Sequence, residues 1–324
     1  MDQGNDHGGD LAQAMGLFGG TTADWIDLST GINRVPYPAA PASAAALRDL
    51  PGRAARDRLI GAAQAAYATD WPVLPLAGAQ AAIQLVPAIA PPGPVRIVAP
   101  TYNEHAGVLR TAGRDVQAVE EAQALAGAAL GIVVNPNNPD GQRWAPDTLR
   151  GLADRVGLLV VDESFADPHP ELSVLGGPCP DNVLVLRSFG KFYGLAGLRL
   201  GFALGSRALL DRMAARAGPW PVCGPAIEAG TQALADAEWR ADSIARLADD
   251  AARADALAAA AGWPLVGGTA LFRLYDTGDA PAARARLARH HIWTRIFPYS
   301  AKWLRLGLPG TPAEWARLAA ALRA

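Results

Sequence analysis

Lys191 is one of only two lysines in the chain, the other being Lys302, although Lys and Arg together number 29. It lies in the stretch S-F-G-K-F-Y-G-L-A-G-L-R-L-G, which runs from Ser188 to Gly201. Arginine stays protonated in proteins, whereas a lysine beside aromatic side chains can lose its proton and attack a carbonyl to form a Schiff base. The stretch therefore predicts a lysine that reacts with an aldehyde.

The same stretch offers two groups that could hold an anion close to this amine. Ser188, three residues before the lysine, supplies a hydroxyl, and Arg199, eight residues after it, supplies a fork of N–H donors. An aldehyde that carries a phosphate suits all three groups, and pyridoxal 5′-phosphate (PLP) is such a molecule. The alternative interpretation of this stretch alone is a solvated glycine-rich connection.

Polar residues also follow two of the strands that the sequence predicts. Asp162 comes directly after the apolar strand 158–161, and Asn135 opens the turn N-P-N-N-P after the strand 130–134. A carboxylate in that place is costly unless it meets a cation or several donors, so a protonated pyridine nitrogen would suit Asp162, with a structural cap as the alternative. The carboxyl ends of strands are also where open α/β sheets bind ligands.

A glycine turn at Gly78-Ala79-Gln80 opens a predicted helix, which we expect to end or kink at Pro87. Free backbone N–H groups and the positive end of the helix dipole make such a turn a ready phosphate site, although many helices begin this way without a ligand.

Strands and helices alternate from about residue 42, which predicts an α/β domain with a largely parallel sheet. The segment 226–261 predicts one long helix or two. The strands predicted at 270–275, 292–296 and 303–308, with helices at 281–290 and 311–322, indicate a smaller α+β domain. Arg295 and Arg305 lie on separate strands of it, and either could hold a substrate anion. We expect an arm at 1–40, a large domain at 41–218 and a small domain at 219–324.

Composition sets the remaining bounds. The chain has 324 residues, of which 50% are hydrophobic, and a formal net charge of −2, so bulk charge favours neither a nucleic acid nor a membrane surface as partner. Cys179 and Cys223 have no spacing that suggests a disulfide framework or a metal site. The N-terminus lacks the pattern of an export signal, and no apolar run reaches membrane-spanning length. We expect a cytoplasmic enzyme without a metal.

Taken together, these motifs resemble the fold-type I PLP enzymes of the aminotransferase class I/II group. The motifs are G-A-Q at 78–80, P-T-Y at 100–102, N-P-N-N-P at 135–139, D-E-S-F at 162–165 and S-F-G-K at 188–191 with Arg199. They occur in the family's order from the N-terminal arm to the last helix. The resemblance implies a large domain with a mostly parallel seven-stranded sheet flanked by helices, and a smaller α+β C-terminal domain.

The resemblance also implies a role for each matching residue. Lys191 would bind the PLP aldehyde, Asp162 would pair with the pyridine N–H, Asn135 would bind the ring hydroxyl, and Tyr102 would stack on the ring. The phosphate would be held by Ser188, Arg199 and the turn formed by Gly78, Ala79 and Gln80. Arg305, in L-R-L-G-L-P, falls where the family binds the substrate α-carboxylate.

Within that group, three shorter motifs are similar to those of the L-threonine-O-3-phosphate decarboxylases, close relatives of histidinol-phosphate aminotransferase. They are H-G-G-D at 7–10, S-T-G-I-N at 29–33 and W-T-R ending at Arg295. This similarity implies decarboxylation of L-threonine O-3-phosphate for cobalamin biosynthesis by a homodimer. The residues it places against the substrate are His7, Gly8, Gly31, Asn135, Arg295 and Arg305.

Two rival functions remain open at this point. The same lysine and cofactor could transfer the amino group of a phosphorylated compound such as histidinol phosphate, or the chain could be a binding protein that kept the fold. The sequence also departs from the family pattern. Gly31 and Arg34 stand where relatives often have Asn and Pro, Leu50 precedes Pro51 where many have Tyr, and Phe165 replaces the Tyr of D-E-x-Y.

Overall fold

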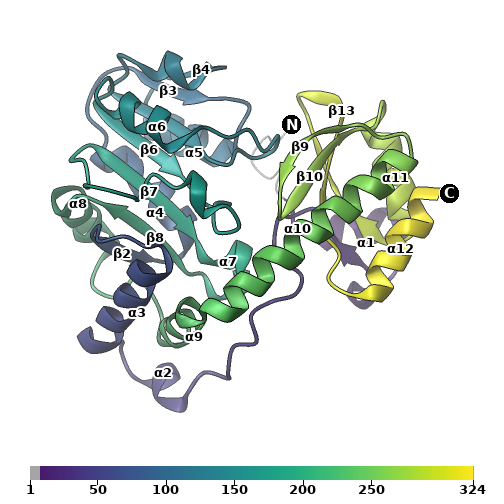
Figure 1. Cartoon of the computed structure of the whole chain (residues 1–324), viewed down its shortest axis with the longest axis horizontal. Coiled ribbons are helices and arrows are strands. Elements are labelled where there is room, and N and C mark those ends of the chain that lie inside the picture. The colour runs from purple at the N-terminus through teal and green to yellow at the C-terminus, as the bar shows by residue number, and fades with distance from the viewer. Residues whose placement is uncertain (1–7, 324) are drawn as a thin grey trace. The chain divides into compact units, whose positions relative to one another are not determined.

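The structure, a computed structural model, describes residues 8–323 and separates into two compact units (Figure 1). The larger unit comprises Pro36–Asn138 and Gln142–Asp242, and the described part of the smaller one comprises residues 8–35, 139–141 and 243–323. The larger unit extends past the predicted boundary at 218/219 because helix α9 (Gly224–Ala235) packs on helix α3 (Arg53–Ala66). The predicted division at 40/41 and 218/219 stays a prediction.

A mostly parallel sheet of seven strands forms the centre of the larger unit, which confirms the predicted fold class (Figure 1). The strand order is β2-β8-β7-β6-β5-β3-β4, and β8 runs antiparallel to both of its neighbours. Its strands are β2 (Val73–Leu76), β3 (Val95–Val98), β4 (Val116–Val119), β5 (Leu130–Val134), β6 (Leu158–Asp162), β7 (Val183–Ser188) and β8 (Gly201–Gly205).

Helices cover this sheet because its central strands are apolar on both faces. Every residue of β5 and β6 is buried. The core continues into α4 (Gly78–Ile89) through Ile83 and Val86, and into α8 (Arg207–Ala217) through Met213. The remaining helices of this unit are α2 (Ala44–Arg48), α4 (Gly78–Ile89), α5 (Asn103–Thr111), α6 (Pro146–Ala153), α7 (Phe189–Phe192) and α8 (Arg207–Ala217). Helix α4 was expected to end or kink at Pro87; it continues for two residues and ends at Ile89, so Pro87 lies in its last turn, and a kink there stays a prediction.

The three strands β5, β6 and β7 are parallel neighbours, so their carboxyl ends share one edge of the sheet. Val134 is opposite Asp162, and Asp162 is opposite Leu186, two residues before Ser188. Asn135, Asp162 and Ser188 therefore lie along the same edge, where the sequence predicts a ligand.

The smaller unit contains a four-stranded antiparallel sheet and a short parallel pair. The sheet has the order β12-β13-β10-β9, and β1 (Ile26–Asp27) pairs with β11 (Ile292–Trp293). Strand β9 was missed because Gly267 and Gly268 weaken its pattern. The other elements are α1 (Leu11–Phe18), α10 (Ala237–Ala260, which begins in the larger unit), β9 (Leu265–Thr269), β10 (Phe272–Asp276), α11 (Ala280–Ala288), β12 (Arg295–Phe297), β13 (Ser300–Gly307) and α12 (Pro312–Arg323). Among the described residues, no helix has the length and apolar character needed to cross a membrane.

Candidate active site

Lys191 lies in α7, the single helical turn that follows β7. The aromatic side chains on either side of it, Phe189 and Phe192, are fully buried, whereas Lys191 itself is half-buried. Its Nζ lies 5.6 Å from the ring centroid of Phe165, which belongs to the segment after β6. The structure therefore holds the amine against an aromatic face while leaving it accessible, as a carbonyl-attacking lysine requires.

An anion cradle is built from the start of α4 and the loop after α7. Gly78 has a positive φ of 83°, and a Cβ there would lie 2.9 Å from Arg199 Nη2, so the guanidinium lies directly against the glycine turn. A Cβ on Gly201 would lie 2.4 Å from the backbone N of Ala79. Ala77, the N-cap of α4, provides no side-chain cap for the first N–H groups. A helix start without a side-chain cap, beside a guanidinium, is suited to bind a phosphate.

Asp162 is the buried carboxylate of the site. His105 Nε2 lies 2.8 Å from its Oδ2, and the backbone N–H of Ser164 donates to its Oδ1 at 2.9 Å. The Ser164 hydroxyl donates to the same Oδ1. Burial raises the pKa of Asp162, but the hydrogen bond and charge of His105 and the Ser164 donors outweigh burial and lower the pKa overall. Asp162 is thus an anion at neutral pH, able to accept a further proton donor.

Tyr102 is the N-cap residue of α5, four residues downstream of β3, and its half-buried ring lies edge-on to that of His105. The Tyr102 hydroxyl donates to Gln80 Oε1 at 3.2 Å, and Gln80 Nε2 donates to Glu104 Oε2 at 2.7 Å. Burial, followed by the charges of Glu104 and Asp162, raises the pKa of Tyr102 to about 12. Its hydroxyl therefore stays protonated, and its predicted stacking on the cofactor ring stays a prediction.

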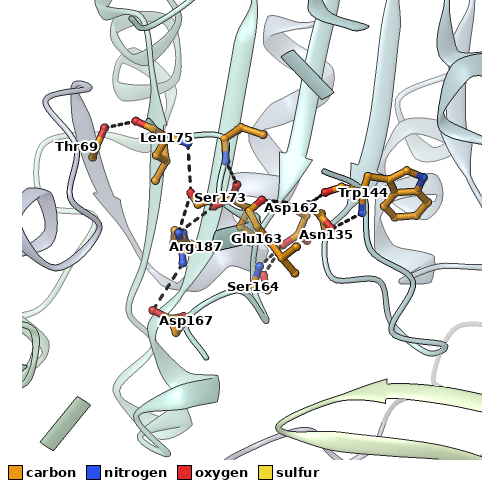
Figure 2. Close-up of polar contacts among 12 residues, drawn as sticks. Thr69, Asn135, Trp144, Asp162, Glu163, Ser164, Asp167, Ser173, Leu175 and Arg187 are labelled. Atoms are coloured by element: carbon orange, nitrogen blue, oxygen red, sulfur yellow. Dashed lines mark hydrogen bonds and ion pairs between the residues drawn. The ribbon is translucent and has the colours of Figure 1, made fainter. Parts of the chain in front are cut away.

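Asn135 is fully buried, and its amide is already engaged by the protein. Nδ2 donates to the backbone carbonyls of Trp144 and Leu172, at 3.0 and 3.2 Å, and Oδ1 accepts from the N–H of Trp144 at 3.1 Å (Figure 2). Both N–H donors of the amide are used in this way. Asn135 therefore fastens the turn after β5 to two other segments, and the structure does not present it as a donor to a ligand.

The smaller unit holds the other predicted substrate residues that the structure describes; His7 lies outside the described residues. Arg295 and Arg305 are directly opposite each other on β12 and β13. Arg305 Nη2 donates to the backbone carbonyl of Ser29 at 2.7 Å, and a Cβ on Gly8 would lie 2.4 Å from the same oxygen. Gly31 is buried in the turn that follows Ser29. Two guanidiniums, a glycine and a tight turn thus meet in one region of this unit.

Comparison with known families agrees with this geometry. The sequence profile of the family described as aminotransferase class I and II matches residues 53–322, from the start of α3 almost to the end of α12. The chain belongs to the class I and II aminotransferase family.

Two threonine-phosphate decarboxylases are similar over nearly the whole chain, and a histidinol-phosphate aminotransferase is similar over about three quarters of it. A threonine-phosphate decarboxylase from Sinorhizobium sp. is 44% identical over 98% of this chain and 97% of its own length. Another threonine-phosphate decarboxylase, from Pseudomonas aeruginosa, is 43% identical with the same coverage. A histidinol-phosphate aminotransferase from Mycobacterium bovis is 34% identical over 76% of this chain and 73% of its own length.

Solved structures of aminotransferases share the fold. The histidinol-phosphate aminotransferase from Sinorhizobium meliloti, in complex with PLP, has a TM-score of 0.76 and 20% identity over 97% of this chain and 93% of its own. The L-threonine-O-3-phosphate decarboxylase from Porphyromonas gingivalis has a TM-score of 0.68 and 20% identity over 91% of this chain and 98% of its own. The sites described above fit the same cofactor, since an accessible lysine, a buried anion and a phosphate cradle match its aldehyde, ring nitrogen and phosphate.

Sequence reasoning missed a buried ionic network behind these aminotransferase motifs (Figure 2). Arg187 Nη2 lies 2.9 Å from Glu163 Oε2 and Nη1 lies 3.8 Å from Asp167 Oδ1, and the guanidinium covers the ring of Tyr67. Glu163 also accepts from Ser173 and the N–H of Val174. The network thus connects Glu163, which follows Asp162, to Arg187, which precedes Ser188. An arginine after four apolar residues, in V-L-V-L-R, was the available signal.

The role of His105 was also not predicted from the sequence. Its relation to Asp162 spans 57 residues of sequence, and no spacing rule links them. Among the described residues, no group of three His, Cys, Asp or Glu side chains could hold a metal ion.

Proposed function

We propose that the chain uses PLP to decarboxylate L-threonine O-3-phosphate to (R)-1-amino-2-propanol O-2-phosphate, for cobalamin biosynthesis. The observation that carries this proposal is the pair of threonine-phosphate decarboxylases at 43–44% identity over 98% of the chain. The candidate site supports it, because a reactive lysine, a buried carboxylate and a phosphate cradle occur together in one unit.

In this proposal, Lys191 binds the cofactor aldehyde and Asp162 keeps the ring nitrogen protonated. The N-terminus of α4 at Gly78, Ala79 and Gln80 holds the phosphate, together with Ser188 and Arg199. Tyr102 packs on the ring. PLP, when bound, supplies an electron sink that accepts the electron pair of a bond broken at the substrate's α-carbon.

The ring-hydroxyl contact requires a different residue from the one expected. Both N–H donors of Asn135 bind backbone carbonyls, and Asn137 donates to the carbonyl of Pro100 and accepts from Thr101. Asn138, the half-buried amide of the same turn, is more accessible than the other two. We therefore assign the ring-hydroxyl contact to Asn138 and a structural role to Asn135.

The other steps are performed by side chains of this chain. The Nε2–H of His105 and the donors of Ser164 keep Asp162 anionic while charge changes next to it. When the bond between the α-carbon and the carboxylate breaks, CO2 would leave and the electron pair of that bond would pass into the electron sink that the bound cofactor supplies. The amine of Lys191 would then deliver a proton to the α-carbon, which forms the new C–H bond with that electron pair. The reaction is redox-neutral and needs no second substrate.

Arg295 and Arg305 are suited to the two anions of the substrate. Burial is the main cause that lowers the pKa of Arg305 to about 10, and the positive charge of Arg295 is the second. Arg305 therefore remains a cation at neutral pH, and a neighbouring anion would stabilise its charge. We assign the α-carboxylate to Arg305 and the phosphate to Arg295. Gly8 and Gly31 would contribute only backbone groups.

Amino transfer from a phosphorylated amino compound is the second candidate, and the 34% identity to a histidinol-phosphate aminotransferase favours it. Both candidates use the same lysine, so the test must measure both products. We expect CO2 and aminopropanol phosphate from L-threonine O-3-phosphate, in equal amounts, without 2-oxoglutarate. Amino transfer to 2-oxoglutarate with no CO2 would reject the decarboxylase. A homodimer and a cytoplasmic location remain predictions.

A further inference from the structure

The turn 29–34 in the smaller unit links the candidate substrate residues to one another. Ser29 accepts through its carbonyl from Arg305 Nη2 at 2.7 Å, and through its Oγ from the N–H of Gly9 at 2.8 Å. The Ser29 hydroxyl in turn donates to Asp27 Oδ1 at 2.6 Å. A Cβ on Gly307 would lie 2.4 Å from the carbonyl oxygen of Thr30, so the turn lies directly on β13. Any shift of this turn therefore moves the Ser29 carbonyl oxygen, to which Arg305 donates.

Arg34 fastens the far end of the same turn to helix α12. Its Nε donates to Glu314 Oε2 at 3.1 Å and its Nη2 to Oε1, which makes the pair bidentate. Its Nη1 also reaches the carbonyl of Asp27 at 3.3 Å. Glu314 accepts in addition from the N–H of Gly310 at 2.6 Å, and a Cβ on Gly310 would lie 2.6 Å from the Arg34 carbonyl. The two ends of the turn are thus held by separate arginines.

The Arg34–Glu314 pair is partly removed from water, with 28% and 17% of the side chains exposed. Burial raises the pKa of Glu314, but hydrogen bonds from Arg34 and Gly310 outweigh it and lower the pKa overall. The carboxylate is therefore charged at neutral pH. A bidentate guanidinium–carboxylate pair fixes direction as well as distance, which a lysine at position 34 would not reproduce.

We infer that Arg34 and Glu314 are positioning residues for the substrate: their ion pair fixes the turn 29–34 and thereby sets the Ser29 carbonyl that orients Arg305. The inference rests on the proposed function, because it assigns Arg305 to a substrate anion. Neither residue needs to touch the substrate. Loss of the pair should loosen the turn and weaken substrate binding, while the PLP site, which is built from the larger unit, should be unaffected.

Two measurements on Glu314→Gln and Arg34→Lys test this inference. Hydrogen exchange followed by mass spectrometry should show faster exchange in the peptide that covers 28–35. Steady-state kinetics with L-threonine O-3-phosphate should show KM raised roughly 5- to 30-fold, as expected for loss of a partly buried bidentate pair, with kcat within about twofold and PLP affinity unchanged. The double variant Arg34→Glu with Glu314→Arg, which exchanges the two charges, should bring KM part of the way back to the wild-type value.

Asp255→Asn is the matched control. Asp255 forms a bidentate pair with Arg273 in the same unit, with 29% and 13% exposure, at contacts that do not involve the turn. It should lower stability without changing KM or exchange at 28–35. Unchanged exchange in Glu314→Gln, or unchanged KM in an active enzyme, would overturn the inference. A wild-type chain that releases no CO2 would instead reject the proposed function, and the exchange data would still show whether the pair holds the turn.

Discussion

His105 Nε2 lies 2.8 Å from Oδ2 of Asp162, and both side chains are almost completely buried. Because the anionic carboxylate can only accept, Nε2 must carry the proton in this bond. His105 Nδ1 is buried and has no hydrogen-bond partner among the described residues. The structure therefore places a proton on Nε2 of His105, in a hydrogen bond to the anionic carboxylate of Asp162.

Replacing His105 should weaken the hold on the cofactor. In His105→Phe the carboxylate loses a charge-assisted hydrogen bond worth about 1.5–3 kcal/mol, its pKa rises, and PLP should bind roughly 10- to 100-fold more weakly. Fluorescence titration of the apoenzyme with PLP measures this. His169→Phe, which alters a half-buried histidine beside Arg143, serves as control. Equal PLP affinity in the two variants would show that His105 does not support Asp162.

Asn135 and Asn138, two of the three asparagines of the N-P-N-N-P turn, should have different roles. Asn135→Ala removes three buried hydrogen bonds, so the free energy of unfolding should fall by about 2–4 kcal/mol in urea. Asn138→Ala should change stability by less than about 1 kcal/mol but weaken PLP binding about tenfold, because it removes the ring-hydroxyl donor. If Asn138→Ala binds PLP normally and a stable Asn135 variant does not, the reassignment is wrong.

The glycine that supports the phosphate cradle should be irreplaceable. A Cβ on Gly201 would meet the Ala79 nitrogen at 2.4 Å, so Gly201→Ala should displace the start of α4 and weaken PLP binding at least about tenfold. Pyridoxal, which lacks the phosphate, should be affected much less. Gly197→Ala provides the control, because a Cβ there meets nothing within 4 Å. If PLP and pyridoxal lose the same factor in binding affinity, the substitution does not act through the phosphate cradle.

Asp167 should make stability depend on pH. Burial, reinforced by Glu163 and opposed by Arg187, raises the pKa of Asp167 to about 6. The carboxyl thus keeps a proton in the folded state that it releases near the ordinary Asp pKa of 3.8 in the unfolded state, so the contribution of this group to stability is lost as pH rises through about 6. As pH rises from 4 to 7, the free energy of unfolding of Asp167→Asn should increase relative to that of the wild type by up to about 3 kcal/mol. Parallel stability curves for the two proteins in urea would contradict this.

Local patterns were sufficient to predict a largely parallel sheet and to single out candidate site residues. The seven strands of that sheet were implied by the family resemblance and not by the alternation of strands and helices. Asp162 became a candidate because a carboxylate directly follows a buried strand. Lysine is so rare in this chain that Lys191 stood out. Each of these signals is contained within a few neighbouring residues, and the alternation of side chains along a strand and the residue preferences of turns operate over that distance.

Sequence patterns gave no information where partners are distant in sequence. The carbonyls of Trp144 and Leu172, which accept from Asn135 Nδ2, lie on other segments of the chain. The pair between Arg34 and Glu314 spans 280 residues. Tertiary hydrogen bonding decides which polar side chains remain available to a ligand, and no local pattern reports it.

The central claim is that Lys191 carries the cofactor, and one measurement tests it directly. The holoenzyme is reduced with borohydride and digested with trypsin, and the modified peptides are identified by mass spectrometry. Since modified lysine resists trypsin, the account predicts a phosphopyridoxyl group on the peptide 188–199, which Arg187 and Arg199 delimit, and none on the peptide that contains Lys302. Reduction that labels Lys302 or no lysine at all, in protein incubated with excess PLP, would contradict the account.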